Sequence, residues 1–220
     1  MSKTAALIGA TGLIGGYLLE ELLNDPYFDK VKILIRRPFA LDHPKLEKKI
    51  VDFTDADSLY VALTDTHTVF CCIGTTQRKV KGDKEAYRKI DYDIAVNAAR
   101  FSKMTGCEKF ILVSSVGANS KSKNFYLNLK GEIEDAVKTQ GLKSVYIMRP
   151  SLLLGERKET RLIESISKKL MPVFSFLIPA KYKPIQASDV AKAMLAAAKK
   201  SDEGFFTWEY NAIKHSIKSM

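Results

Sequence analysis

The sequence predicts an α/β fold in which a doubly wound, mostly parallel sheet carries helices on both faces. An apolar run at residues 5–8 leads into spaced glycines and then into a helical pattern. Short apolar runs and amphipathic segments then alternate nearly to the end of the chain. The length of 220 residues suits one α/β domain, and no linker or repeat divides it. We therefore expect a single domain over residues 1–220.

The first segment combines a strand, a tight turn and a helix. Gly9, Gly12 and Gly15 follow the apolar run, and a helical pattern continues to residue 23. One glycine permits an unusual φ, one lets the backbone approach a pyrophosphate, and one lets helix and strand pack closely. The helix directs its free N–H groups at the phosphate. This segment predicts a nucleotide-binding turn.

The remaining elements alternate in the same way. Strands are expected at residues 30–35, 49–53, 67–73, 109–115, 144–148 and 205–210. Helices are expected from residue 54 or 55 to 63, then at 84–105, 124–140, 158–170 and 188–200. Apolar strands joined through helices indicate parallel pairing, because parallel strands need crossover connections.

Composition indicates which partners, compartment and membrane segments to expect. The net charge of +10 favours anionic partners, but the basic clusters are short, so no nucleic-acid binding is expected. Three cysteines form neither a disulfide framework nor metal-ligand spacing, and a cytoplasmic location is the expectation. The apolar stretches at 5–19 and 170–180 are short and contain glycine or proline, so no transmembrane segment is expected.

The end of the second strand indicates the type of cofactor. Arg36 and Arg37 stand where NAD-binding folds place a carboxylate, and a guanidinium suits a 2′-phosphate. The alternative is a solvated basic turn. After the third strand, Asp52 and Phe53 either flank an adenine or serve as a helix cap and a core side chain. Both alternatives remain open here.

A second group of residues suits proton transfer. Tyr126 and Lys130 lie one helical turn apart, so the ammonium can stabilise a tyrosinate. Ser114 and Ser115 end the preceding strand, at the sheet edge where ligands bind. The alternative is a packed tyrosine beside a solvated lysine. Together these residues favour protonation of an alkoxide beside a nicotinamide.

These residues resemble the atypical branch of the short-chain dehydrogenase/reductase superfamily, most closely the Tat-interactive-protein-like oxidoreductases. The resemblance covers at least residues 4–157. It rests on Gly9-x-x-Gly12-x-x-Gly15, Leu34-Ile35-Arg36-Arg37-Pro38, Cys72-Ile73-Gly74-Thr75-Thr76, Ser114-Ser115-Val116-Gly117-Ala118, Tyr126-x-x-x-Lys130-Gly131-Glu132 and Arg149-Pro150-Ser151. A further match at residues 185–191 looks like the start of the family's late helix.

The resemblance implies a Rossmann domain that binds NADP(H), with residues 1–150 as the cofactor-binding core. It implies catalytic positions for Ser115 (Ser114 as the alternative), Tyr126 and Lys130. The implied cofactor-binding set is Gly9, Thr11, Gly12, Leu13, Ile14, Gly15, Arg36, Arg37, Asp52, Phe53, Cys72, Ile73, Gly74, Ser114, Lys130, Pro150 and Ser151. No metal is implied.

One departure from the superfamily concerns its helix asparagine, whose position is taken by Asp91. The lysine–water relay of the superfamily therefore lacks its asparagine in this chain. We expect an NADP(H)-dependent oxidoreductase acting on a small carbonyl or alcohol, as a monomer or homodimer. An NADPH-sensing regulatory protein and a sugar-nucleotide epimerase or dehydratase are the alternatives.

The segment at 151–187 is expected to cover the substrate, and 188–220 to supply the last helix and strand. Arg157 and Arg161 either hold an anionic substrate or belong to a solvated helix face. The apolar stretch at 171–178 suits a substrate pocket, a membrane surface or a dimer contact.

Overall fold

A seven-stranded sheet, parallel at every pairing, forms the centre of the computed structural model, which describes residues 2–75, 80–155 and 179–218. The order of the strands is β3-β2-β1-β4-β5-β6-β9. The strands are β1 (Thr4–Ile8), β2 (Lys30–Ile35), β3 (Leu46–Ile50), β4 (Thr68–Cys71), β5 (Lys109–Val113), β6 (Ser144–Met148) and β9 (Gly204–Trp208). This sheet confirms the expected fold class.

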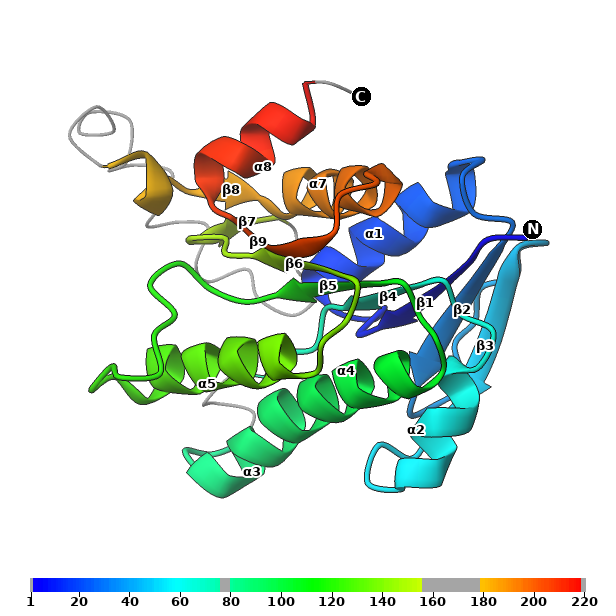
Figure 1. Cartoon of the computed structure of the whole chain (residues 1–220), viewed down its shortest axis with the longest axis horizontal. Coiled ribbons are helices and arrows are strands. Elements are labelled where there is room, and N and C mark those ends of the chain that lie inside the picture. Colours follow the sequence, from blue (N-terminus) through cyan, green and yellow to red (C-terminus); the bar gives the residue numbers. More distant parts are fainter. Residues whose placement is uncertain (1, 76–79, 156–178, 219–220) are drawn as a thin grey trace.

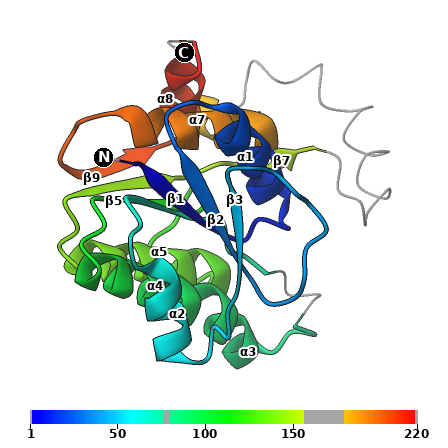
Figure 2. The same cartoon turned by 90° about the vertical axis from the view of Figure 1, so that its right-hand side faces the viewer.

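Helices cover both faces of the sheet, as Figures 1 and 2 show. On one face lie α1 (Leu13–Asn24), α7 (Ala187–Lys199) and α8 (Tyr210–Ser216), and on the other α2 (Ala56–Leu63), α4 (Ile94–Met104) and α5 (Phe125–Thr139). Each face buries its own hydrophobic cluster, because strands covered on both sides are apolar on both sides. A short parallel pair, β7 (Leu153–Leu154) with β8 (Ile185–Gln186), lies outside the main sheet.

The strand order reverses between β1 and β4. From β1 the chain proceeds outward through β2 and β3, and from β4 it proceeds the other way through β5, β6 and β9. Ile8 pairs with Cys71, so the turn after β1 and the loop after β4 start side by side. Such a switch point is where parallel α/β sheets bind ligands.

Several predicted strand limits were wrong by a few residues. The third strand spans Leu46–Ile50 instead of residues 49–53, because each of its residues pairs in register with β2 from Val31 onward. The fourth strand is limited to Thr68–Cys71, where its pairing with β1 and β5 ends. The pairing of β7 with β8 and the helix α8 were not predicted.

The long helix predicted at residues 84–105 is interrupted. It consists of α3 (Lys84–Arg88), a π-helical turn at Lys89–Asp93 and α4. The Asp83 carboxylate caps its first turn by accepting hydrogen bonds from the N–H groups of Glu85 and Ala86. Helix α7 begins at Ala187, one residue before the predicted start, and Asp189 in its first turn pairs with Lys214.

Some expectations lie outside the described residues. These are the helix at 158–170, Arg157 and Arg161, and the apolar stretch at 171–178. Among the residues that are described, no helix has the length and apolar character needed to cross a bilayer. The η2 turn (Ala180–Tyr182) precedes β8.

Candidate functional site

The glycine turn after β1 owes its shape to close backbone contacts. Gly9 has φ +88°, and a Cβ there would lie 2.7 Å from the carbonyl oxygen of Cys72. A Cβ on Gly15 would lie 2.0 Å from the carbonyl oxygen of Gly9, so helix α1 packs directly against the turn. Gly12 is exposed at the start of α1, where the first N–H groups of a helix lack intrahelical partners. This geometry suits an anion at Gly12.

The loop after β4 is held by two side chains of the neighbouring helix. Tyr87 donates its hydroxyl to the carbonyl oxygen of Thr75 at 2.9 Å, and the Asp91 carboxylate accepts the Thr75 N–H at 2.7 Å. The N–H and C=O groups of Thr75 are therefore both hydrogen-bonded to side chains that lie four residues apart on the helix. This clamp fixes residues 72–75 beside the glycine turn.

Lys130 forms a buried ion pair with Asp91. Its Nζ lies 2.8 Å from Asp91 Oδ2, and the residues are 5% and 1% exposed. The same ammonium lies 5.9 Å from the ring centroid of Tyr126, one turn earlier on α5. The structure thus brings the predicted tyrosine and lysine together on one face, and adds a carboxylate to them.

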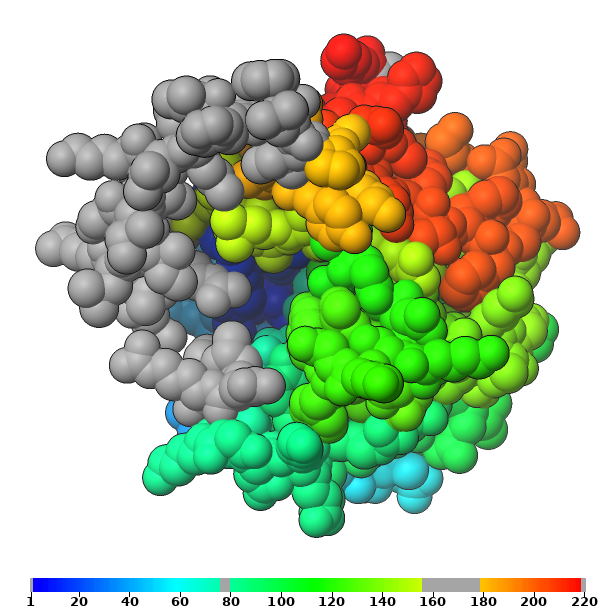
Figure 3. Space-filling view, turned by 90° about the vertical axis from the view of Figure 1, so that its left-hand side faces the viewer, coloured from blue at the N-terminus to red at the C-terminus, as the bar shows by residue number. Residues whose placement is uncertain are grey.

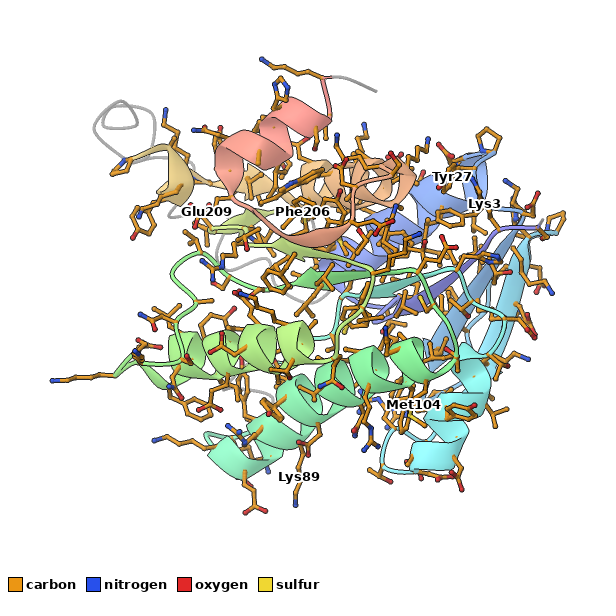
Figure 4. All side chains as sticks on the ribbon, in the orientation of Figure 1. Lys3, Tyr27, Lys89, Met104, Phe206 and Glu209 are labelled. Atoms are coloured by element: carbon orange, nitrogen blue, oxygen red, sulfur yellow. The ribbon has the colours of Figure 1, made fainter. Side chains whose placement is uncertain are left out.

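The π-helical turn accounts for the position of Asp91. Inside an α-helix such a turn adds one residue to the local repeat and re-aims the side chains around it. Lys89, in the same turn, points away from the body of the molecule, as Figure 4 shows, whereas Asp91 is buried against Lys130. The periodicity of the sequence alone gives a regular helix and does not reveal this turn.

The charge of Lys130 reflects two opposing effects. Burial lowers the pKa of Lys130, because desolvation disfavours the ammonium. The Asp91 carboxylate, the nearby Tyr126 and the hydrogen bond to Asp91 raise it, and the resulting pKa lies above the ordinary value. Lys130 is therefore a cation at neutral pH, paired with an anion.

The two adjacent serines have different partners. Ser114 is buried and donates its hydroxyl to the carboxylate of Glu134. Ser115 is only partly buried, and its hydroxyl has a 3.3 Å contact to the carbonyl oxygen of Val116. Ser115 is therefore the serine more accessible to a ligand.

The proposed adenosine end of the site is more exposed. Arg36 and Arg37 follow β2 and are both solvent-exposed. The Asp52 carboxylate accepts from the Thr54 hydroxyl and N–H at 2.7 and 2.8 Å, which lowers its pKa. Phe53 packs against the core. Asp52 therefore stabilises its own turn, and the helix cap that follows is Asp55.

Four predicted residues are engaged in contacts within the protein. Ile14 is buried in the core, and the Cys72 sulfur faces Met194 at 3.8 Å. Ser151 donates its hydroxyl to the carbonyl oxygen of Lys183, and the backbone carbonyl of Pro150 accepts the Val116 N–H at 3.0 Å. The side chains of Ile14, Cys72 and Ser151 thus have partners inside the protein.

The remaining predicted residues lie along the same edge of the sheet. Thr11, Gly12 and Gly74 are exposed, and Leu13 and Ile73 are partly buried. Figure 3 views this edge and shows a hollow whose floor is formed by N-terminal residues, in dark blue, between the green atoms of the α5 region and yellow-green atoms near the end of β6. A Cβ on Gly74 would lie 3.9 Å from Asp91 Oδ2, so the loop after β4 lies between the glycine turn and the buried Lys130–Asp91 pair.

A dinucleotide fits the chemistry of this edge. The start of α1 offers unpaired N–H groups beside an exposed glycine, and two exposed guanidinium groups follow the adjacent strand. Phosphate groups match both features. Within the described part of the chain, no three metal-ligating side chains converge.

The sequence interpretation missed Glu134, Arg149, Tyr87 and Thr75 as supporting residues. Arg149 pairs with Glu134 and lies 3.9 Å from Glu209, which Figure 4 marks. Glu134 follows Lys130 by four residues and therefore shares its helix face, which was the available signal. The Thr75 contacts are backbone contacts, and no sequence pattern reports them.

Comparison with known proteins places the chain in a family. A family described as NAD(P)H-binding matches residues 9–201. The chain is 33% identical to "Protein HTATIP2" of Rattus norvegicus over 171 residues, covering 76% of this chain and 70% of that protein. It is 34% identical to "Protein fmp52, mitochondrial" of Aspergillus clavatus over 209 residues, covering 90% and 88%.

Solved structures confirm the fold. The enzyme WbmH of Bordetella bronchiseptica, in complex with NAD+, has a TM-score of 0.75 at 18% identity and covers 98% of this chain and 79% of its own. MoeE5, in complex with UDP-glucose and NAD, has a TM-score of 0.73 at 17% identity and covers 99% and 82%. At these identities the likeness concerns the fold alone.

The expected cytoplasmic location is contradicted. The fungal relatives, including those of Aspergillus clavatus and Candida albicans, are named as mitochondrial proteins. Cysteine content alone suggested the cytoplasm, and it does not distinguish between reducing compartments.

Proposed function

Because the chain belongs to the NAD(P)H-binding family of atypical short-chain dehydrogenase/reductase-like proteins, we propose that it is an NADP(H)-dependent oxidoreductase acting on a small carbonyl or alcohol. The observation that carries this proposal is the Tyr126–Lys130 face of α5, with its buried Lys130–Asp91 pair, beside the glycine turn. A buried lysine beside a tyrosine at the carboxyl edge of a parallel sheet is an arrangement typical of functional sites.

Separate parts of the chain would hold the parts of the cofactor. The N–H groups at the start of α1, by Gly12, would bind the pyrophosphate, and Arg36 with Arg37 would bind the 2′-phosphate. The loop at 72–75 would line the adenosine side, and Lys130 would donate to the nicotinamide ribose. When bound, NADP(H) supplies or accepts the hydride.

Side chains of α5 and of the loop after β5 would transfer the proton and orient the substrate. Tyr126 would donate its hydroxyl proton to the substrate oxygen as the carbonyl carbon is reduced, and accept it in the reverse direction. Lys130 would stabilise the resulting tyrosinate through its positive charge. Ser115 would donate a hydrogen bond to the substrate carbonyl and so fix its orientation.

The catalytic assignment is tested with Tyr126→Phe. We expect NADPH affinity within about twofold of the parent, and turnover of a carbonyl panel reduced by at least about 100-fold, the range lost with a general acid. Tyr60→Phe, on α2, is the matched control and should leave turnover unchanged. Equal turnover in Tyr126→Phe and the parent would refute the assignment. NADPH binding without turnover in the parent would favour an NADPH-sensing protein instead.

The NADP(H) preference is tested by separate titrations with NADPH and NADH. We expect NADPH to bind more tightly, because charge-assisted bonds to the 2′-phosphate are absent in NADH. Arg36→Ala and Arg37→Ala should weaken NADPH binding and leave NADH binding unchanged, so NADH is the internal control. Equal affinities for both nucleotides in the parent would refute the preference.

The names of the fungal relatives support a mitochondrial location for this chain as well. The full chain with a C-terminal fluorescent tag should co-fractionate with mitochondrial markers. Recovery with soluble cytoplasmic markers alone would contradict this part of the proposal.

A further inference from the structure

Asp91 determines the net charge at one end of the site. Its carboxylate contacts Lys130 at 2.8 Å, and both residues are buried, so water screens the pair poorly. A neutral side chain at this position would leave the ammonium of Lys130 without a compensating charge. The chain instead holds a neutral ion pair.

The neighbouring titratable groups add no net charge to the Lys130–Asp91 pair at neutral pH. Burial raises the pKa of the Cys71 thiol to about 11, and burial with the nearby Asp91 raises the pKa of Tyr87. Glu134 is paired with Arg149, and Arg88 is paired with Glu132. Asp91 is thus the carboxylate that offsets Lys130.

We propose that Asp91 raises the affinity of the site for the oxidised cofactor, NADP+, relative to the reduced cofactor, NADPH. By neutralising Lys130, it removes the repulsion that an isolated ammonium would exert on an oxidised nicotinamide. The inference rests on the proposed function, because it requires Lys130 to lie at the nicotinamide ribose.

The physical basis is the single charge that separates the two oxidation states. NADP+ carries a positive nicotinamide ring, whereas the ring of NADPH is neutral, and the rest of the two molecules is identical. A net charge beside the ring therefore changes the affinity for NADP+ far more than that for NADPH. Contacts with the phosphates and adenosine cancel in the ratio of the two dissociation constants.

The test measures the dissociation constants of NADP+ and NADPH by titration of the full chain at pH 7 and low salt. In Asp91→Asn the carboxylate that raises the pKa of Lys130 is gone, so the titration is repeated at pH 6, where the ammonium form is favoured. There the ratio of the NADP+ to the NADPH constant should rise by at least about fivefold, given the strength of a poorly screened charge at short range. In Lys130→Met, Asp91 remains and the ratio should fall. The double variant should return close to the parent ratio.

Asp93→Asn is the matched control, because Asp93 lies in the same π-helical turn but is exposed. The ratio of the NADP+ to the NADPH dissociation constant in this variant should equal that of the parent. Far-ultraviolet circular dichroism identifies a variant that does not fold. If one single variant does not fold, the other decides the test, because the direction in which its ratio of dissociation constants should change is predicted separately.

Two outcomes would overturn the inference. The first is a ratio within twofold of the parent in each folded single variant, and the second is a change of the same sign in both. A parent chain that binds neither nucleotide would instead refute the proposed function.

Discussion

The Arg149 guanidinium binds the Glu134 carboxylate in two places, with Nε 3.0 Å from Oε1 and Nη2 2.5 Å from Oε2. Glu134 also accepts the Ser114 hydroxyl and is 4% exposed. This bidentate pair connects the end of β6 to α5, the helix that carries Tyr126 and Lys130. It therefore adds a polar connection between that helix and the carboxyl edge of the sheet, beside the apolar packing of α5.

Arg149→Met should destabilise the fold by about 3 kcal/mol, because it leaves the Glu134 carboxylate buried without its partner. Urea unfolding followed by circular dichroism measures the loss. The double variant Glu134→Leu/Arg149→Met should recover most of it, since no buried charge remains. Arg88→Met is the control, because it breaks the more exposed pair with Glu132 and should cost less than about 1 kcal/mol. Equal losses in the two single variants would contradict this account.

Gly15→Ala should unfold the nucleotide-binding turn or prevent folding, because its Cβ would lie 2.0 Å from the carbonyl oxygen of Gly9. The adjacent Gly16 is the matched control. A Cβ there would lie 3.8 Å from the carbonyl oxygen of Ala10, which is an ordinary contact, and Gly16→Ala should raise stability by up to about 1 kcal/mol. Thermal unfolding of both variants measures the difference. A Gly15→Ala chain as stable as Gly16→Ala would contradict the close packing seen here.

Tyr87→Phe should release one side of the clamp on Thr75 while keeping the buried ring. The lost hydrogen bond should cost about 1 kcal/mol in unfolding free energy, because the Thr75 carbonyl oxygen loses its donor. NADPH affinity should weaken if the 72–75 loop lines the cofactor. Tyr60→Phe controls for the loss of a hydroxyl elsewhere. A variant with the stability and the NADPH affinity of the parent would show that the clamp has no role.

The sequence predicted the features that local rules determine. The glycine spacing predicted the turn at residues 9–15, and the periodicity predicted the order of strands and helices. Long-range contacts were not predictable in this way. The ion pair of Asp91 with Lys130 joins residues 39 apart, and only the packed helices bring them together. The π-helical turn at Lys89–Asp93, which positions Asp91, is local but has no signal in the periodicity. The role of Ser114 was ambiguous for the same reason, because its partner Glu134 lies 20 residues later.

Cys107 should make the stability of the protein depend on pH in the alkaline range. Burial raises the pKa of its thiol from 9.0 to about 12. Below pH 9 the thiol is protonated in both the folded and unfolded chains, so it contributes no pH dependence there. Above pH 9 the thiol ionises only in the unfolded chain, and the stability it contributes is lost as the pH rises toward 12.

The variant Cys107→Ala isolates this effect from other alkaline titrations. The difference in unfolding free energy between the parent and the variant should be constant from pH 7 to 8. It should then shrink by about 1.4 kcal/mol for each pH unit above the pKa of the unfolded thiol. Urea titrations at pH 7, 8, 9 and 10 measure the difference. A difference that stays constant to pH 10 would show that the folded thiol ionises as easily as the unfolded one.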